Sequence, residues 1–199
     1  MSSVDTPLQL QDGYLPIEDH GLIGDGATAA LVGRNGEITW MCVPRFDSEP
    51  LFCALLDRNH GGSFAVIPES VTGATQRYEE DTGVLVTEMR CPEGRLRVTD
   101  ALALRAGSDL SEDTAADRGE LIRIIEVLDG QVRVRIRIEP WGGAHCYPHA
   151  GGLGLRPHRR PDLELLLTSS LSLEGLDSTH ALPAGSQHHL VLAWGSAGG

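Results

Sequence analysis

The feature that most constrains this chain is the run from Gln131 to Ile138, in which apolar residues and arginines alternate without a break. A side-chain period of two is that of a β-strand with one buried and one exposed face. We expect the apolar set to face the core and the arginines to face away. The apolar set is Val132, Val134, Ile136 and Ile138, and the basic set is Arg133, Arg135 and Arg137. This pattern predicts a half-buried strand.

The pair Asp129-Gly130 separates this run from a second apolar-rich run, residues 120–128. Asp-Gly favours a two-residue type I′ turn. The two runs are therefore predicted to form a hairpin in which Arg133 lies opposite Glu126. We interpret the arginines as one face of a half-covered sheet rather than as an anion-binding or partner-binding stripe, because the net charge of the chain is −12 and arginine stems cover apolar surface.

Two more hairpins are predicted. Asn35-Gly36 is a type I′ turn signal that places Leu31 opposite Trp40, with both side chains assigned to the core. Residues 92–95 are interpreted as a four-residue loop, because that register opposes apolar side chains. Its pairs are Cys91 with Leu96, Met89 with Val98 and Leu85 with Leu102. Further strands are expected at residues 63–67, 163–168 and 188–194, with another at 70–77.

The remaining segments complete the expected fold. One short helix is predicted from Glu49 to Leu56, with Ser48 as N-cap and Pro50 in the first turn. Residues 107–119 read as a polar loop, and residues 141–161 as a long irregular excursion. The predicted fold class is all-β, a two-layer antiparallel β-sandwich with one short helix.

Composition excludes several functions. All 16 basic residues are arginine against 28 acidic residues, so non-specific binding to nucleic acid or to an anionic membrane is not expected. Without lysine there is no Schiff-base or phosphate-loop lysine. No apolar run is long enough to cross a bilayer, and the first residues lack the pattern of a signal peptide. The cytoplasm is the expected compartment.

The cysteines and histidines give no strong metal signal. The four cysteines lack a C-x-x-C pair, so we interpret them as buried or inert thiols. His145, Cys146 and His149 have donor atoms suited to a transition metal, but they lie in a glycine-rich stretch that no rigid element positions. We expect no metal site and no cofactor. A metal-dependent enzyme that uses these three residues stays open as a hypothesis that metal analysis would test.

The densest mixture of reactive side chains is the stretch from Trp40 to Ser48. Arg45, Phe46 and Asp47 follow Pro44 in succession and combine a planar donor, an aromatic face and a carboxylate, the groups that hold a sugar. Together with Trp40 they form the candidate substrate-binding set. The alternative is structural: Asp47 or Ser48 caps the predicted helix while Phe46 enters the core.

Two stretches resemble the opening of bacterial glycoside hydrolase family 15 proteins, the glucoamylase and trehalase-like enzymes. They are Tyr14-Leu-Pro-Ile-Glu-Asp-His-Gly-Leu-Ile-Gly-Asp-Gly, continuing to Trp40, and Pro44-Arg-Phe-Asp-Ser48. Further matching pieces are residues 51–62, 95–100 and 120–126 and the pair Glu139-Pro140. The chain departs from the family pattern after Pro140, where Trp141-Gly-Gly-Ala stands in place of an aromatic-aspartate-tyrosine-glycine stretch. The resemblance covers about residues 14–195.

The resemblance implies an N-terminal β-sandwich followed by a C-terminal (α/α)₆ catalytic barrel. Residues 1–13 would then be a flexible segment, 14–195 the domain, and 196–199 the start of a linker. The parent enzyme is expected to hydrolyse α-glucosidic bonds with inversion, using two carboxyl groups. Neither the barrel's glutamates nor its glucosyl-pocket motif has a counterpart here, so no catalytic residue is assigned and this chain alone is expected to be inactive. A free-standing carbohydrate-binding module is the alternative function.

Overall fold

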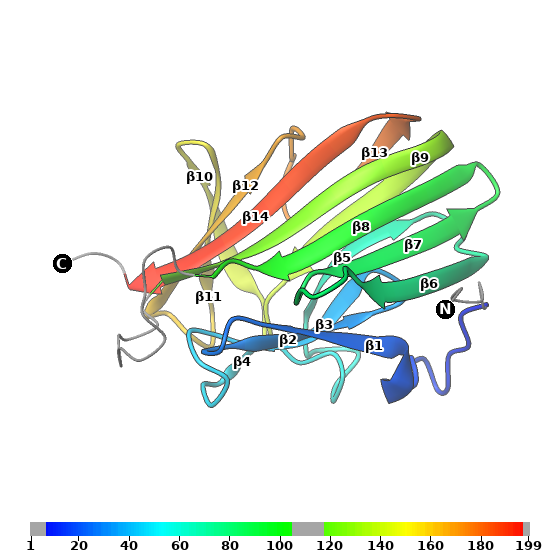
Figure 1. Ribbon diagram of the computed structural model, residues 1–199. Helices are drawn as coiled ribbons and strands as arrows, with labels where there is room; N and C mark the ends of the chain where they lie inside the picture. Colours follow the sequence, from blue (N-terminus) through cyan, green and yellow to red (C-terminus); the bar gives the residue numbers. More distant parts are fainter. Residues whose placement is uncertain (1–6, 105–117, 197–199) are drawn as a thin grey trace.

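The computed structural model describes residues 7–104 and 118–196, and within them fourteen strands and one 3₁₀ turn (Figure 1). The turn is η1 (Ile17–Asp19). The strands before the gap are β1 (His20–Gly24), β2 (Ala29–Gly33), β3 (Glu37–Cys42), β4 (Pro50–Phe52), β5 (Ser63–Pro68), β6 (Gly73–Tyr78), β7 (Leu85–Cys91) and β8 (Gly94–Leu102). Those after it are β9 (Arg118–Glu139), β10 (Ala144–His149), β11 (Gly152–Pro157), β12 (Leu163–Ser169), β13 (Asp177–Pro183) and β14 (Gln187–Ser196).

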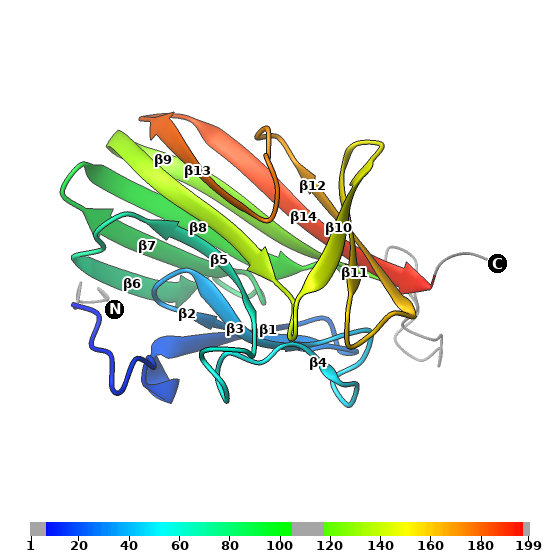
Figure 2. The same ribbon diagram turned by 180° about the vertical axis from the view of Figure 1, so that it is seen from behind.

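The strands form two antiparallel layers that share β9, as the two opposite views in Figures 1 and 2 show. Layer I has the order β1-β2-β3-β5-β9-β13, with β4 also paired to β3. Layer II has the order β6-β7-β8-β9-β14-β12-β11-β10. The buried core contains residues of both layers. The all-β sandwich predicted from the sequence is confirmed.

Strand β9 corrects the clearest hairpin prediction. Its first half pairs with β8 and β14 and its second half with β5 and β13. Glu126 lies opposite Arg97 and Gln187, whereas Arg133 lies opposite Ala181. The chain does change direction at Gly130, where φ is +74°, but the two arms enter different layers instead of pairing with each other. Strands that switch sheets through such bends form the corners of sandwiches.

The two faces of β9 agree with the alternation in the sequence. Its inward residues after Gly130 are all buried: Val132, Val134, Ile136 and Ile138. The arginines between them point outward and pair with acidic side chains, Arg133 with Glu69, Arg135 with Asp177 and Arg137 with Glu139. The interpretation as a half-covered sheet face is therefore confirmed, although Glu126 is not the partner of Arg133.

The β2–β3 hairpin has the predicted pair but a different turn and a different orientation. Leu31 does lie opposite Trp40. The turn, however, closes through a hydrogen bond from Gly36 N to Gly33 O, with positive φ at Gly36 and not at Asn35. A bulge leaves Thr39 without a cross-strand partner in β2. It shifts the phase of the strand, so the core takes Ile38 and Met41, and Trp40 and Leu31 are only partly buried.

The β7–β8 hairpin is tighter than predicted. Cys91 pairs with Gly94 and Met89 with Leu96, so the loop contains two residues instead of four. The observed register differs by two positions from the predicted one. Because side chains alternate with a period of two, this shift keeps every residue on the same face. The hydrophobic pattern was therefore unable to distinguish the two registers.

Three further expectations have definite outcomes. The predicted helix is wrong: Pro50–Phe52 forms β4, because its backbone pairs with the end of β3. The predicted irregular excursion is also wrong, since it contains the β10–β11 hairpin. The strands expected at residues 63–67, 70–77, 163–168 and 188–194 are confirmed as β5, β6, β12 and β14. Of the predicted polar loop, residues 107–117 lie outside the described residues, and residues 118 and 119 begin β9. Of the predicted terminal segments 1–13 and 196–199, residues 1–6 and 197–199 lie outside the described residues.

A buried ion pair joins the two layers. Arg123 of β9 and Asp100 of β8 are both 0% exposed, and Arg123 Nε lies 2.7 Å from Asp100 Oδ1. The same guanidinium donates to the carbonyl oxygens of Phe64 and Gly36 in layer I, at 2.7 and 2.8 Å. At the far edge, the Tyr78 hydroxyl of β6 accepts from Leu22 N and donates to Leu22 O of β1. These contacts fix the spacing of the layers.

Candidate functional site

The candidate loop runs from Val43 to Glu49 and leaves β3 through a cis peptide bond at Val43–Pro44. Within it, Arg45 Nε lies 3.1 Å from Asp47 Oδ1, and both side chains are more than half exposed. The backbone N–H of Arg45 donates to Ser48 Oγ at 3.2 Å. Phe46 between them is 61% exposed. The loop thus presents an ion pair and an aromatic ring to solvent.

Segments distant in sequence hold this loop in place. The N–H of Phe46 donates to Ala27 O at 2.9 Å, and Arg160 Nη1 donates to Val43 O at 3.3 Å. Arg159 pairs with Glu49 at 2.6 Å. The Arg159 guanidinium also lies over the ring of Trp141, 3.8 Å from its centroid. The loop is therefore fastened from both sides, and its outward side chains are displayed on an anchored backbone.

The structure brings three of the four candidate residues together. Arg45, Phe46 and Asp47 share the loop, whereas Trp40 lies on β3 beside Leu31. The structural alternative is wrong on both points: no helix follows the loop, and Phe46 does not enter the core. The sequence alone did not reveal Arg159, Trp141 or Glu49 as neighbours of the loop. Arg159 and Glu49 are 110 residues apart, and no local pattern signals such a contact.

The outer face of layer I carries a row of apolar side chains. The register places Leu22 beside Leu31, and Leu31 beside Trp40, across β1, β2 and β3. Leu22 is 54% exposed, and Leu31 and Trp40 are half-buried. Ile17 of η1, just before β1, is also exposed. We call Leu22, Leu31 and Trp40 the apolar row.

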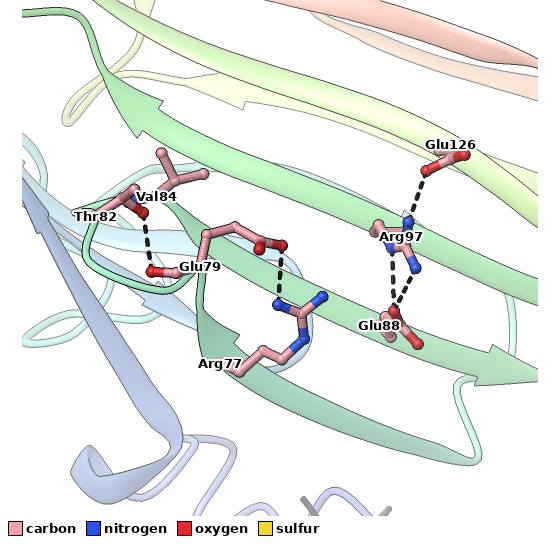
Figure 3. Close-up of polar contacts among 7 residues, drawn as sticks. All are labelled: Arg77, Glu79, Thr82, Val84, Glu88, Arg97 and Glu126. Carbon is pink, nitrogen blue, oxygen red and sulfur yellow. Dashed lines mark hydrogen bonds and ion pairs between the residues drawn. The ribbon is translucent and has the colours of Figure 1, made fainter. Parts of the chain in front are cut away.

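The outer face of layer II is different, because charged side chains on it form ion pairs with one another. Figure 3 shows Arg97 of β8 between Glu88 of β7 and Glu126 of β9, at 2.8 and 3.1 Å. The hydrogen bonds that Arg97 donates to Glu88 and Glu126 raise the pKa of Arg97, with the larger contribution from Glu88. Arg77 similarly pairs with Glu79. These pairs stabilise a sheet surface and leave no free charge on Arg97 for a ligand.

The four cysteines are free thiols, and His145, Cys146 and His149 lie on β10. Cys42, Cys53 and Cys91 are free and buried. Burial, with a smaller contribution from the neighbouring Cys53 thiol, raises the pKa of Cys42 to about 11. Cys146 of β10 pairs with Leu155, and His145 and His149 are exposed on that strand. Among the described residues, no group of three His, Cys, Asp or Glu side chains is placed to hold a metal ion.

Comparison with known proteins agrees with this architecture. The family model described as trehalase-like, N-terminal, matches residues 11–143, about two-thirds of the chain. A trehalase of Thermoplasma volcanium is 46% identical over 93 residues, which cover 45% of this chain and 15% of that protein. The trehalases of Mycolicibacterium smegmatis and Mycobacterium tuberculosis are 29% and 26% identical over 93% of this chain and 31% of each relative.

The fold and these matches define an N-terminal β-sandwich domain of the kind found in trehalases. The chain belongs to the trehalase-like N-terminal domain family. It spans less than a third of the length of the relatives just named. In the part of the chain that the structure describes, no helix is long and apolar enough to cross a membrane.

Proposed function

We propose that this chain is the non-catalytic N-terminal domain of a family 15 glycoside hydrolase that cleaves α-glucosidic bonds. The family match carries the proposal, and residues 14–195 are proposed as the domain. A C-terminal (α/α)₆ barrel supplies the two carboxyl groups that inverting hydrolysis needs. The β-sandwich packs on that barrel, and its candidate loop lends Arg45, Phe46 and Asp47 to the rim of the substrate pocket.

The apolar row supports a docking role for the outer face of layer I. Leu22, Leu31 and Trp40 lie side by side on three strands, and Ile17 of η1 is also exposed. A contiguous patch of exposed apolar side chains often marks a surface that contacts another protein or domain. The candidate loop follows β3 directly, so a barrel seated on this face lies close to Asp47.

A chimeric enzyme tests the docking. This chain replaces the aligned N-terminal region of the M. smegmatis trehalase, and trehalose hydrolysis is compared with that of the same enzyme lacking the region. We expect the chimera to be more active and to melt at a higher temperature than the deletion. Leu22→Asp in the chimera should remove most of the gain, whereas Leu104→Asp, at an exposed leucine beyond the end of β8, should not. A chimera no better than the deletion would contradict the proposal.

Asp47→Asn in the active chimera tests the substrate role. Asp47 accepts hydrogen bonds from sugar hydroxyls, with Arg45 orienting the carboxylate, and charge-assisted bonds are stronger than neutral ones. We expect kcat/KM for trehalose to fall by about tenfold or more, equivalent to about 1.4 kcal/mol of transition-state binding, with an unchanged melting temperature.

Asp177→Asn is the matched control for this substitution, because Asp177 is another exposed aspartate paired with an arginine. It lies on β13, outside the candidate loop, and its removal should leave kcat/KM unchanged. Full activity of Asp47→Asn would remove the substrate role and leave the loop as a structural element. Equal losses in both variants would show that exposed ion pairs act through stability instead.

A further inference from the structure

A small polar pocket lies on the outer side of β3. One wall is the N-terminal segment, which contributes Tyr14 and His20. Glu37 and Thr39 of β3 also line it, as does Arg58 in the segment after β4, whose N–H donates to the Tyr14 hydroxyl. Three separate segments therefore meet around one pocket that the proposed function does not use.

Two buried polar atoms in this pocket lack hydrogen-bond partners. Among the residues that the structure describes, these are His20 Nε2 and Thr39 Oγ1. Thr39 is only 5% exposed, and it is the residue displaced by the β3 bulge. An unpaired buried hydroxyl or imidazole nitrogen costs free energy, and native structures satisfy nearly all such atoms with protein or ordered water. Because both residues line one pocket, a single bound molecule is able to hydrogen-bond both atoms.

The hydrogen bonds already made determine what that partner must do. His20 Nδ1 lies 3.0 Å from the carbonyl oxygen of Pro16. A carbonyl oxygen only accepts, so Nδ1 carries the proton, and Nε2 of the neutral ring is an acceptor. Thr39 Oγ1 has a proton to donate and lone pairs to accept. The partner must therefore donate to His20 and is able to accept from Thr39.

The Glu37 carboxylate beside the pocket has capacity for one more hydrogen bond, and the Tyr14 hydroxyl still has a proton to donate. Glu37 is buried and accepts from Ser63 Oγ at 2.7 Å, and from Arg58 Nη1 and Asn35 Nδ2 at 3.3 Å each. An ionised carboxylate has about four acceptor positions. The Tyr14 hydroxyl accepts from Arg58 N at 3.1 Å and keeps its own proton. A partner with two donors and two acceptor positions fits this set.

The size of the pocket identifies that partner. The cavity has a volume of about 10 Å³, close to what a single water molecule needs. We propose that one structural water molecule is held here, donating to His20 Nε2 and Glu37 and accepting from Thr39 Oγ1. It links His20, at the start of β1, to Glu37 and Thr39 of β3.

High-resolution crystallography of the 199-residue chain tests the site directly. We expect one ordered water within about 3 Å of both His20 Nε2 and Thr39 Oγ1. An empty pocket, or a protein side chain that satisfies both atoms, would overturn the proposal.

Magnetic relaxation dispersion of water nuclei tests it in solution, because this method counts long-lived internal waters. Thr39→Val removes the hydroxyl while keeping the shape of the side chain, and should lower the count by one. Thr28→Val is the matched control, since the buried Thr28 hydroxyl donates directly to Cys42 O. That variant should leave the count unchanged. An equal count in Thr39→Val and the parent chain would contradict the proposed contacts.

Discussion

Arg123 is the largest fully buried side chain among those described, and it is charged. Its place on a strand among apolar residues gave no reason to expect a fully buried charge. The structure supplies that reason, because Asp100 neutralises the guanidinium, and the carbonyl oxygens of Phe64 and Gly36 accept hydrogen bonds from its Nη1 and Nη2. Buried charges persist in proteins when they are paired and hydrogen-bonded in this way.

Arg123→Met tests this network. It leaves the buried Asp100 carboxylate and the Phe64 carbonyl oxygen without the hydrogen bonds from Arg123, whereas the Gly36 carbonyl oxygen keeps its bond from Val66 N. We expect a loss of about 3–5 kcal/mol in the free energy of unfolding, measured by urea denaturation. Arg135→Met removes an exposed ion pair and should cost about 0–1 kcal/mol. Similar losses in the two variants would contradict the assigned role of Arg123.

The raised pKa of the buried Cys42 thiol predicts that the free energy of unfolding falls at alkaline pH. Its pKa rises to about 11 in the folded chain, so above pH 9 the unfolded state releases a proton that the folded state still binds. The contribution to stability is present below pH 9 and is lost as the pH rises toward 11. Between pH 8 and 10, Cys42→Ala should therefore lose less unfolding free energy than the parent chain. Between pH 6 and 8 the two chains should change in parallel.

At the scale of the elements, β9 decides the architecture. Its alternation is continuous on both sides of Gly130, yet the two halves belong to different layers. The corner is possible because Gly130 adopts φ +74° and lies against the β7–β8 turn. A Cβ atom at this position would stand 1.9 Å from the carbonyl oxygen of Glu93.

Gly130→Ala is therefore expected to be strongly destabilising. Gly185 is the matched control, because it has a similar φ of +78° but no atom within 4 Å of the place that an added Cβ would occupy. Gly185→Ala should cost about 1–2 kcal/mol for the left-handed backbone alone. Gly130→Ala should cost clearly more, because backbone atoms must also move. Thermal or urea unfolding of the two variants gives the comparison, and equal losses would show that the corner does not depend on close contact.

At the scale of the whole molecule, the chain displays two unlike outer faces. Layer II presents paired charges around Arg97, whereas layer I presents the apolar row beside the candidate loop. This asymmetry favours a domain that uses one face to contact a larger partner. A free-standing carbohydrate-binding module needs no such contact face, so the asymmetry favours the proposed domain over that alternative.

Two measurements on the chain alone follow from this view. Calorimetric titration with maltose, trehalose and soluble starch should give no binding heat, because under the proposed function the candidate loop forms only the rim of a pocket that the barrel completes. The purified chain should also release no glucose from trehalose or maltose, because the proposed function assigns both proton-transfer groups to that barrel. Saturable binding of one sugar would favour the module, and robust glucose release would overturn the assignment of a non-catalytic domain.

Local patterns in the sequence were sufficient for strands β2, β3, β5 to β9, β12 and β14, for the inward and outward faces of β9 and for the family resemblance. Each of these depends on residues close together in the chain, through side-chain alternation or a continuous motif. Tertiary structure alone decided the partners: the two layers of β9, the two-residue β7–β8 turn, the outward Trp40 and the strand in place of the predicted helix. The physical reason is that hydrogen-bond pairing, bulges and corners depend on which distant backbone offers a partner. The alternation of Val134 and Arg135 is local, whereas the contacts of Arg123 with Gly36 and of Arg159 with Glu49 form only when the layers close.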